Sequence, residues 1–176
     1  MSHKIALIGA GAMGCAIGAR LGQMGQDLTV YDLDAKKVAA LVRLGATSAS
    51  SAAMAAAQAD FVVISLNAAQ IVEQAVFGPQ VVAEGAKTGS LLIDMSSIDP
   101  DAPKALAAKA AGLGLRWVDS PLSGGAPKVA LGQLTLMMGG AAQDVAEAQQ
   151  HIDAADRRRF GRRRSSCADG IFHRTK

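Results

Sequence analysis

The chain has 176 residues, with 18 Lys and Arg against 15 Asp and Glu, which gives a formal net charge of +3. Hydrophobic residues make up 50% and charged residues 19%, so the composition excludes a disordered chain and indicates a globular domain with a real core. The charge is uneven, because residues 157–176 hold a net +7 and residues 1–156 a net −4. The basic character therefore belongs to the C-terminal segment.

The sequence gives no signal for disulfides, a metal site, a membrane span or a signal peptide. Cys15 and Cys167 form no Cys/His cluster, so we predict neither a disulfide framework nor a metal site. No uninterrupted apolar run reaches about 18 residues, so no membrane partner is predicted. The start of the chain lacks the layout of a signal peptide, and we expect a cytoplasmic protein.

Short apolar runs alternate with Ala-rich helical stretches, which is typical of an α/β protein with a parallel sheet. The first half is predicted to hold, in chain order, strand Lys4–Ile8, helix Ala12–Met24, strand Asp27–Asp32, helix Ala35–Leu44, a short segment near Ala46-Thr47, helix Ser51–Gln58, strand Phe61–Leu66 and helix Ala69–Phe77. Strand Leu91–Met95 follows, and then a helix with Asp99 as N-cap and Pro100 at the first helical position, leading into Asp101–Ala111. The last predicted elements are strands at Trp117-Val118 and Leu134–Met138 and helix Ala142–Gln150. This order predicts a Rossmann-type, doubly wound, mostly parallel sheet over residues 1–156.

The segment Gly9–Gly14 is a G-x-G-x-x-G placed directly between the first strand and the first helix. In that context the motif predicts a dinucleotide-binding turn, because Gly11 lets the backbone approach a pyrophosphate and Gly14 lets the helix pack closely. The helix N-terminus adds free N–H groups for the phosphates. The predicted cofactor residues here are Gly9, Gly11, Ala12, Met13 and Gly14. The alternative is a glycine-rich turn without a ligand.

Asp32 ends the second strand, where its carboxylate can accept hydrogen bonds from the adenosine ribose hydroxyls. The same charge would repel a 2′-phosphate, and Leu33 and Asp34 supply no Arg to bind one. We therefore predict NAD as the cofactor, with NADP disfavoured. Asp34 is interpreted as the N-cap of the helix that follows.

Four motifs occur in the order found in the β-hydroxyacid dehydrogenases: the Gly9–Gly14 turn, Leu66-Asn67, the segment 94–97 (DMSS) and the segment 119–126 (DSPLSGGA). Over about residues 4–150 the chain resembles this family, which includes 3-hydroxyisobutyrate dehydrogenase and 2-hydroxy-3-oxopropionate reductase. The resemblance implies NAD-linked hydride transfer at the CH–OH carbon of a small hydroxyacid, or reduction of the matching semialdehyde.

The resemblance also implies further site residues. Leu66 and Asn67 would lie along the cofactor, with Asn67 standing where the family often has Pro. Ser96 would lie near the nicotinamide and the substrate carboxylate. Substrate would also be bound, through a hydroxyl and backbone N–H groups, by Ser123, Gly124 and Gly125. The alternative for both segments is an ordinary loop or turn.

No catalytic residue is identified in this sequence. Hydride transfer at a hydroxyl carbon needs a proton donor or acceptor beside the oxygen. In the resembled family this is a Lys in a Gly-x-Gly-x-x-x-Lys pattern that opens an interdomain helix, and no Lys of this chain has that lead. The family's all-helical C-terminal domain is missing as well. We therefore expect a truncated enzyme that binds NAD(H) and is weakly active or inactive.

Residues 157–176 differ from the rest of the chain in composition. They hold seven Arg and one Ala, whereas residues 1–156 hold 35 Ala. Because GC-rich Ala codons read out of frame become Arg codons, we hypothesise that this Arg-rich tail is frame-shifted or disordered.

Two other functions stay open beside the truncated dehydrogenase. One is a non-catalytic NAD(H)-binding module. The other is nucleic-acid binding through the Arg-rich tail, which is disfavoured because no recognisable nucleic-acid module accompanies it. The face left by the missing domain also predicts self-association.

Overall fold

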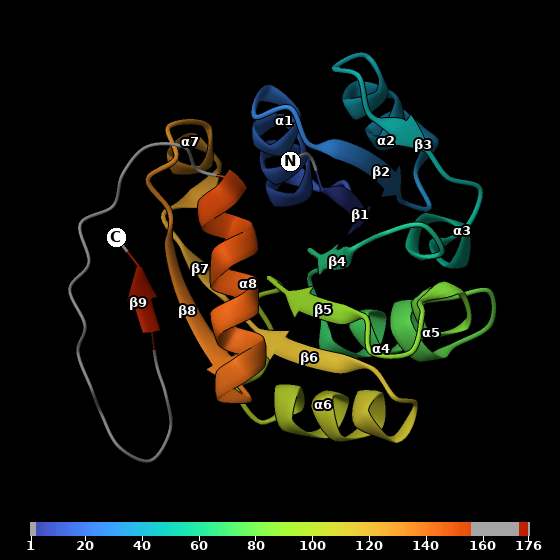
Figure 1. The fold of residues 1–176 in the computed structure, drawn as a ribbon. Helices are drawn as coiled ribbons and strands as arrows, with labels where there is room; N and C mark the ends of the chain where they lie inside the picture. Colours follow the sequence, from blue (N-terminus) through green and yellow to red (C-terminus); the bar gives the residue numbers. More distant parts are fainter. Residues whose placement is uncertain (1–2, 156–172, 176) are drawn as a thin grey trace.

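The computed structural model describes residues 3–155 and 173–175, which form a layered α/β fold (Figure 1). Its strands are β1 (Lys4–Ile8), β2 (Asp27–Tyr31), β3 (Thr47–Ser48), β4 (Phe61–Ile64), β5 (Leu91–Asp94), β6 (Arg116–Asp119), β7 (Leu122–Ser123), β8 (Thr135–Gly140) and β9 (His173–Thr175). They pair in the order β3-β2-β1-β4-β5-β6-β8-β7, with β9 on β8. The pairs from β3 to β6 are parallel, and those of β8 are antiparallel.

Helices cover both faces of this sheet. They are α1 (Ala12–Gln23), α2 (Ala35–Val42), α3 (Ala52–Ala56), α4 (Ala69–Phe77), α5 (Val82–Gly85), α6 (Ala102–Gly112), α7 (Gly125–Ala130) and α8 (Ala142–Ala155). One apolar cluster joins the sheet to α1, α2, α7 and α8, and a second joins it to α3, α4, α5 and α6. The predicted doubly wound, mostly parallel sheet is thereby confirmed.

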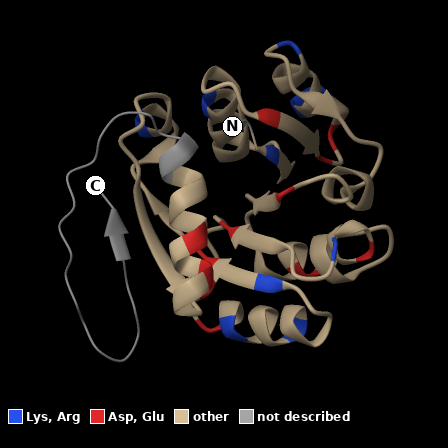
Figure 2. Ribbon diagram, viewed as in Figure 1, with Lys and Arg blue, Asp and Glu red and all other residues tan. Residues whose placement is uncertain are grey.

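The central strands are apolar because helices lie on both of their faces. Every residue of β4 and of β5 is buried, and only the first residue of β1 is exposed. Such a strand has no solvent side and therefore shows a continuous apolar run instead of an alternation. Charged residues lie on helices, loops and strand ends (Figure 2). In the described part of the chain, no helix is long and apolar enough to cross a bilayer.

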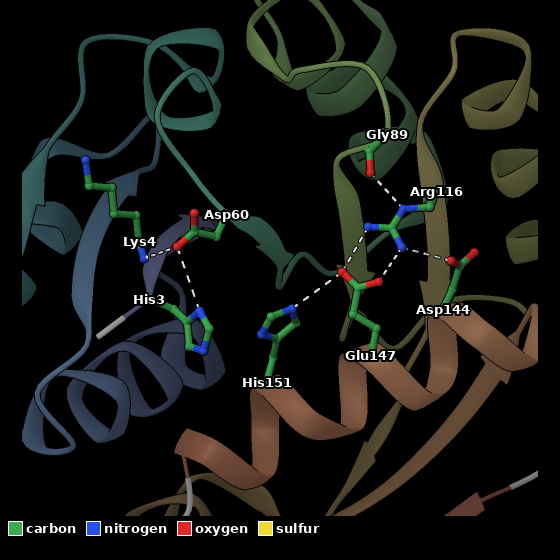
Figure 3. Close-up of polar contacts among 8 residues, drawn as sticks. All are labelled: His3, Lys4, Asp60, Gly89, Arg116, Asp144, Glu147 and His151. Carbon is green, nitrogen blue, oxygen red and sulfur yellow. Dashed lines mark hydrogen bonds and ion pairs between the residues drawn. The ribbon is translucent and has the colours of Figure 1, made fainter. Parts of the chain in front are cut away.

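Helix α8 is held at the amino-terminal edge of the sheet by an ion-pair network (Figure 3). Arg116, the first residue of β6, donates both terminal nitrogens to Glu147, and one of them also to Asp144 at 3.1 Å. Its Nε donates to the carbonyl of Gly89 at 2.7 Å. The hydrogen bond with Arg116 lowers the pKa of Glu147, so that carboxylate stays charged in the folded protein.

The second half of α8 packs on the sheet through His151. Its ring stacks on Phe61 with centroids 4.5 Å apart and meets the ring of His3 edge-on at 4.7 Å. Burial, followed by the neighbouring His3, lowers the pKa of His151. The neutral ring is therefore the form that packs here, and α8 is anchored far from the carboxyl ends of the parallel strands.

Several elements differ from the sequence-based prediction. Strand β4 ends at Ile64 instead of 66, because the N–H of Leu66 leaves the ladder and donates to Ser96 Oγ at 3.0 Å. Helix α6 begins at Ala102, because the Asp99 carboxylate accepts from Asp101 N–H at 3.0 Å and forms a separate turn ahead of the helix. The short helices α5 and α7 were not predicted, and α8 extends to Ala155.

The predicted boundary at residue 156 and most of the Arg-rich tail lie outside the described residues. Within that segment, residues 173–175 form β9, which pairs antiparallel with β8. That the rest of the Arg-rich tail is frame-shifted or disordered stays a prediction.

Candidate functional site

The carboxyl ends of β2, β1, β4, β5 and β6 are neighbours along one edge of the sheet, and the predicted site residues follow these ends. From β1 the chain goes to β2 on one side, and from β4 it goes to β5 and β6 on the other. The edge between β1 and β4 is therefore a topological switch point, where open α/β sheets bind their ligands. The structure brings the predicted cofactor and substrate segments to one edge.

The turn between β1 and α1 has the geometry that its glycines predict. Gly9 has a φ of +96°, and a side chain there would overlap the backbone of Ser65. A methyl group on Gly14 would overlap the carbonyl oxygen of Gly9. Gly11 differs from both, because its φ is −64° and a methyl group would meet no atom within 4 Å. The fold thus requires Gly9 and Gly14, whereas the space beside Gly11 is open to a ligand.

Asp32 is tied to this turn by hydrogen bonds. Its Oδ2 accepts from Ala10 N–H at 2.7 Å, and its Oδ1 accepts from Asp34 N–H at 2.8 Å. A carboxylate oxygen has further lone pairs, so both oxygens can still accept from ribose hydroxyls. Asp34 caps α2 by accepting from Lys36 N–H at 2.9 Å, which confirms its predicted role.

Ser96 lies at the centre of a buried hydrogen-bonded chain that sequence reasoning did not find. Its hydroxyl accepts from the N–H of Leu66 on the predicted cofactor loop at 3.0 Å. Its own N–H donates to Oδ1 of Asp94 at 3.0 Å. Because Ser96 is only 2% exposed, its hydroxyl holds the loop of Leu66 and Asn67 from beneath.

Two carboxylates lie side by side where β5 and β6 end. Asp94 and Asp119 are partners in the parallel register of these strands. Burial raises the pKa of Asp94. Burial, and then the charge of Asp94, raise the pKa of Asp119 to about 6. Ser120 N–H donates to the main-chain carbonyl of Asp94 at 2.7 Å, which joins the next loop to this pair.

The predicted substrate segment forms a tight turn after β7. Ser123 is the last residue of β7, paired with Thr135 of β8, and it is exposed. Gly124 and Gly125 have φ angles of +132° and +70°, which favour glycine. Gly125 opens α7, which packs on α1 and so brings this turn toward the Gly9–Gly14 turn.

Some residues of this edge carried no sequence signal. Ser65 supports the turn because its backbone lies against Gly9, and Ser120 is fully buried. The Cys15 thiol donates to the Ala10 carbonyl at 3.0 Å, and burial raises its pKa. These contacts join segments up to 56 positions apart in the chain, such as Gly9 and Ser65, and no local pattern could show them.

Comparison with protein families agrees with this geometry. Residues 4–160 match the model of the NAD binding domain of 6-phosphogluconate dehydrogenase. The chain belongs to this family of NAD-binding domains. The match begins at β1 and spans the turn, the switch point and the Ser123–Gly125 segment, so this NAD-binding domain includes every predicted site residue.

The relatives that the chain matches include a dehydrogenase and a reductase. The chain is 38% identical over 138 residues to 2-(hydroxymethyl)glutarate dehydrogenase of Eubacterium barkeri, covering 78% of this chain and 46% of that protein. It is 38% identical over 144 residues to 3-sulfolactaldehyde reductase of Escherichia coli strain K12, covering 82% and 48%. The predicted resemblance to the β-hydroxyacid dehydrogenases is confirmed.

A solved structure shows the same fold. Mycobacterium tuberculosis 3-hydroxyisobutyrate dehydrogenase, solved with L-serine, superposes with a TM-score of 0.82 at 27% identity, covering 88% of this chain and 52% of that one. The chain spans about half the length of these relatives.

Proposed function

We propose that this chain is the NAD-binding half of a β-hydroxyacid dehydrogenase. The reaction is hydride transfer between the nicotinamide and the CH–OH carbon of a small hydroxyacid, or reduction of the matching semialdehyde. The observation that carries the proposal is the open space beside Gly11 at the start of α1, next to the Asp32 carboxylate that accepts from Ala10 N–H. Fold-required glycines alone do not explain a glycine at position 11.

NAD is the proposed cofactor in preference to NADP. The carboxylate of Asp32 would face a 2′-phosphate, and Leu33, which follows it, is 91% exposed and uncharged. When bound, NAD supplies the hydride chemistry, and the chain supplies backbone donors for the pyrophosphate and acceptors for the ribose. The relatives named above act on small acids, which supports Ser123, Gly124 and Gly125 as the anion-binding turn.

NADH and NADPH fluorescence titrations, run beside a steady-state assay, test this proposal. We expect NADH to bind more tightly than NADPH and turnover to stay far below about 10 per second, because no Lys in the 176 residues has the family's Gly-rich lead. Absence of NADH binding would refute the proposal. Turnover within tenfold of that rate would show that the missing-lysine argument is wrong.

A non-catalytic NAD(H)-binding module is the second candidate, favoured by the same lack of an acid/base motif. Both candidates bind NADH without turnover, so the gene must distinguish them. Sequencing across codons 145–160 tests for an alternative reading frame. A frame that encodes a Gly-x-Gly-x-x-x-Lys segment supports the dehydrogenase, and its absence supports the module.

We also propose that copies of this chain associate with one another. Leu131 on the α7 side and Met137 on β8 are large apolar residues that stay 62% and 39% exposed. Exposed apolar surface of this kind favours association. Light scattering of the purified chain measures it, and a monodisperse monomer at high concentration would contradict the proposal.

A further inference from the structure

We propose that Asp94 is a positioning residue that controls the cofactor loop through Ser96, so that NAD binding depends on the protonation state of this carboxyl group. The proposal rests on the proposed function for its link to NAD. It concerns a residue that touches neither the Gly9–Gly14 turn nor Asp32.

The chain of contacts runs from β5 to the loop after β4. The N–H of Ser96 donates to Asp94 Oδ1 at 3.0 Å. The hydroxyl oxygen of Ser96 accepts from Leu66 N–H at 3.0 Å. An ionised carboxylate is a stronger acceptor than a neutral carboxyl group, so it fixes the main chain of Ser96 more firmly. Ionised Asp94 therefore holds the Ser96 hydroxyl in the position from which it accepts from Leu66.

Protonation would weaken this arrangement at one specific atom. Asp94 is fully buried, and its Oδ2 has no hydrogen-bond partner. A proton can therefore settle on Oδ2 without displacing a bond. The neutral carboxyl is a weaker acceptor, so it holds the Ser96 N–H less firmly. The hydroxyl that accepts from Leu66 then loses part of its support.

The surroundings of Asp94 favour proton uptake. Burial raises its pKa. Asp119 is its partner in the strand register. The neighbouring strand β4 is apolar throughout. Titratable groups also lie on the other elements around β5. Arg116 pairs with Asp144 and Glu147, His151 lies 3.6 Å from Glu147, and Lys109 pairs with Glu73. Asp99, Asp101 and Lys104, at the start of α6, are exposed.

Asp94 also lies between the loop of Leu66 and Asn67 and the segment that leads to the Ser123–Gly125 turn. Ser120 N–H donates to the main-chain carbonyl of Asp94 at 2.7 Å, and Ser120 begins the segment that leads to the Ser123–Gly125 turn. The Ser120 hydroxyl is buried and has no partner of its own. Asp94 thus contacts the cofactor loop through its side chain and the substrate segment through its main chain.

NMR titration of the chain without ligand tests the contact chain directly. Between about pH 4 and 8, we expect the amide signals of Leu66 and Ser96 to follow the same midpoint as the Asp94 carboxyl carbon. In Ser96→Ala the carboxyl should still titrate while the Leu66 amide no longer follows it. In Asp119→Asn the Leu66 amide should still follow the Asp94 carboxyl, which separates the titrations of the two carboxyl groups. A Leu66 amide that does not titrate, or that titrates unchanged in Ser96→Ala, would overturn the proposal.

Calorimetric titration with NAD over the same pH range tests the consequence. We expect NAD to bind about three- to tenfold more weakly to the protonated form, the loss of about one hydrogen bond. Asp94→Asn should remove this pH dependence, whereas a purely structural role would lower stability and leave the dependence intact. Equal pH dependence in both proteins refutes the role of Asp94 and leaves the NAD function standing. Coupled NMR shifts without NAD binding at any pH would refute the proposed function and retain the contact chain.

Discussion

A methyl group added at Gly11 distinguishes a glycine required by the ligand from one required by the fold. The methyl would meet no protein atom within 4 Å, and the φ of −64° suits alanine. We therefore expect Gly11→Ala to change the free energy of unfolding by between zero and about +1 kcal/mol, a small gain from the less flexible unfolded chain. If the pyrophosphate lies in that space, the same methyl must displace it.

The expected loss of affinity follows from the bonds at the helix start. A backbone N–H that binds a charged phosphate contributes about 1.5–3 kcal/mol, so losing one such bond weakens NADH binding about 10- to 150-fold. Gly14→Ala should behave differently. Its methyl would overlap the Gly9 carbonyl oxygen, and the forced backbone shift should cost about 1–3 kcal/mol of stability.

Urea unfolding and NADH fluorescence titration measure the two effects separately. Gly22→Ala, also in α1, is the matched control, because its methyl would come no closer than 3.8 Å to a neighbouring segment, with Leu44 O as the nearest atom. It should be stabilised by about 0.5–1 kcal/mol with NADH affinity unchanged. Should Gly11→Ala bind NADH within twofold of the parent chain, or unfold like Gly14→Ala, the assignment of the open space to the cofactor is wrong.

Three further changes test the electrostatics. The pKa of Asp119 in the folded protein is about 6, against an ordinary value of 3.8. The native state therefore holds a proton that the unfolded state releases, and stability falls as pH rises from about 4 to 6. Asp119→Asn should add about 1–2 kcal/mol at pH 7 after allowance for partial exposure, and equal urea midpoints of the parent chain at pH 5 and 7.5 would contradict this. Arg116→Ala should cost about 1–2 kcal/mol by removing the guanidinium that hydrogen bonds Glu147 and Asp144, whereas exposed Lys104→Ala should stay within about 0.5 kcal/mol. Asp32→Asn should reduce the preference for NADH over NADPH, and an unchanged ratio of the two dissociation constants would exclude charge as its cause.

Much of the fold could be predicted because its signals are local. The boundaries of β1 agree with prediction, and the strand-turn-helix order follows from apolar runs and glycines a few positions apart. The short helices α5 and α7 lack such signals. Four residues cannot show a helical period, and the Gly-Gly-Ala-Pro start of α7 is typical of a loop. Packing of α7 on α1 supplies the stability that its sequence does not.

The candidate site shows the same division. The Gly9–Gly14 turn and Asp32 could be placed from sequence, because residue types fix a tight turn and an acid at a strand end. The chain from Asp94 through Ser96 to Leu66 could not, since it joins residues 28 positions apart in directions set by strand register. Asp32 likewise carried no sign that it would accept from Ala10.

The sequence by itself determined that the chain is a doubly wound α/β domain with a glycine-rich turn between its first strand and helix, an acid at the end of its second strand and a basic tail distinct from an acidic body. These properties depend on residue types and spacings along the chain. Only the tertiary structure decided that position 11 is open while positions 9 and 14 are closed, that α8 is anchored by Arg116 and His151, and that two carboxylates share the ends of β5 and β6. Those properties depend on which distant atoms meet and which lose their water, and desolvation is set by the packed fold and not by neighbours in sequence.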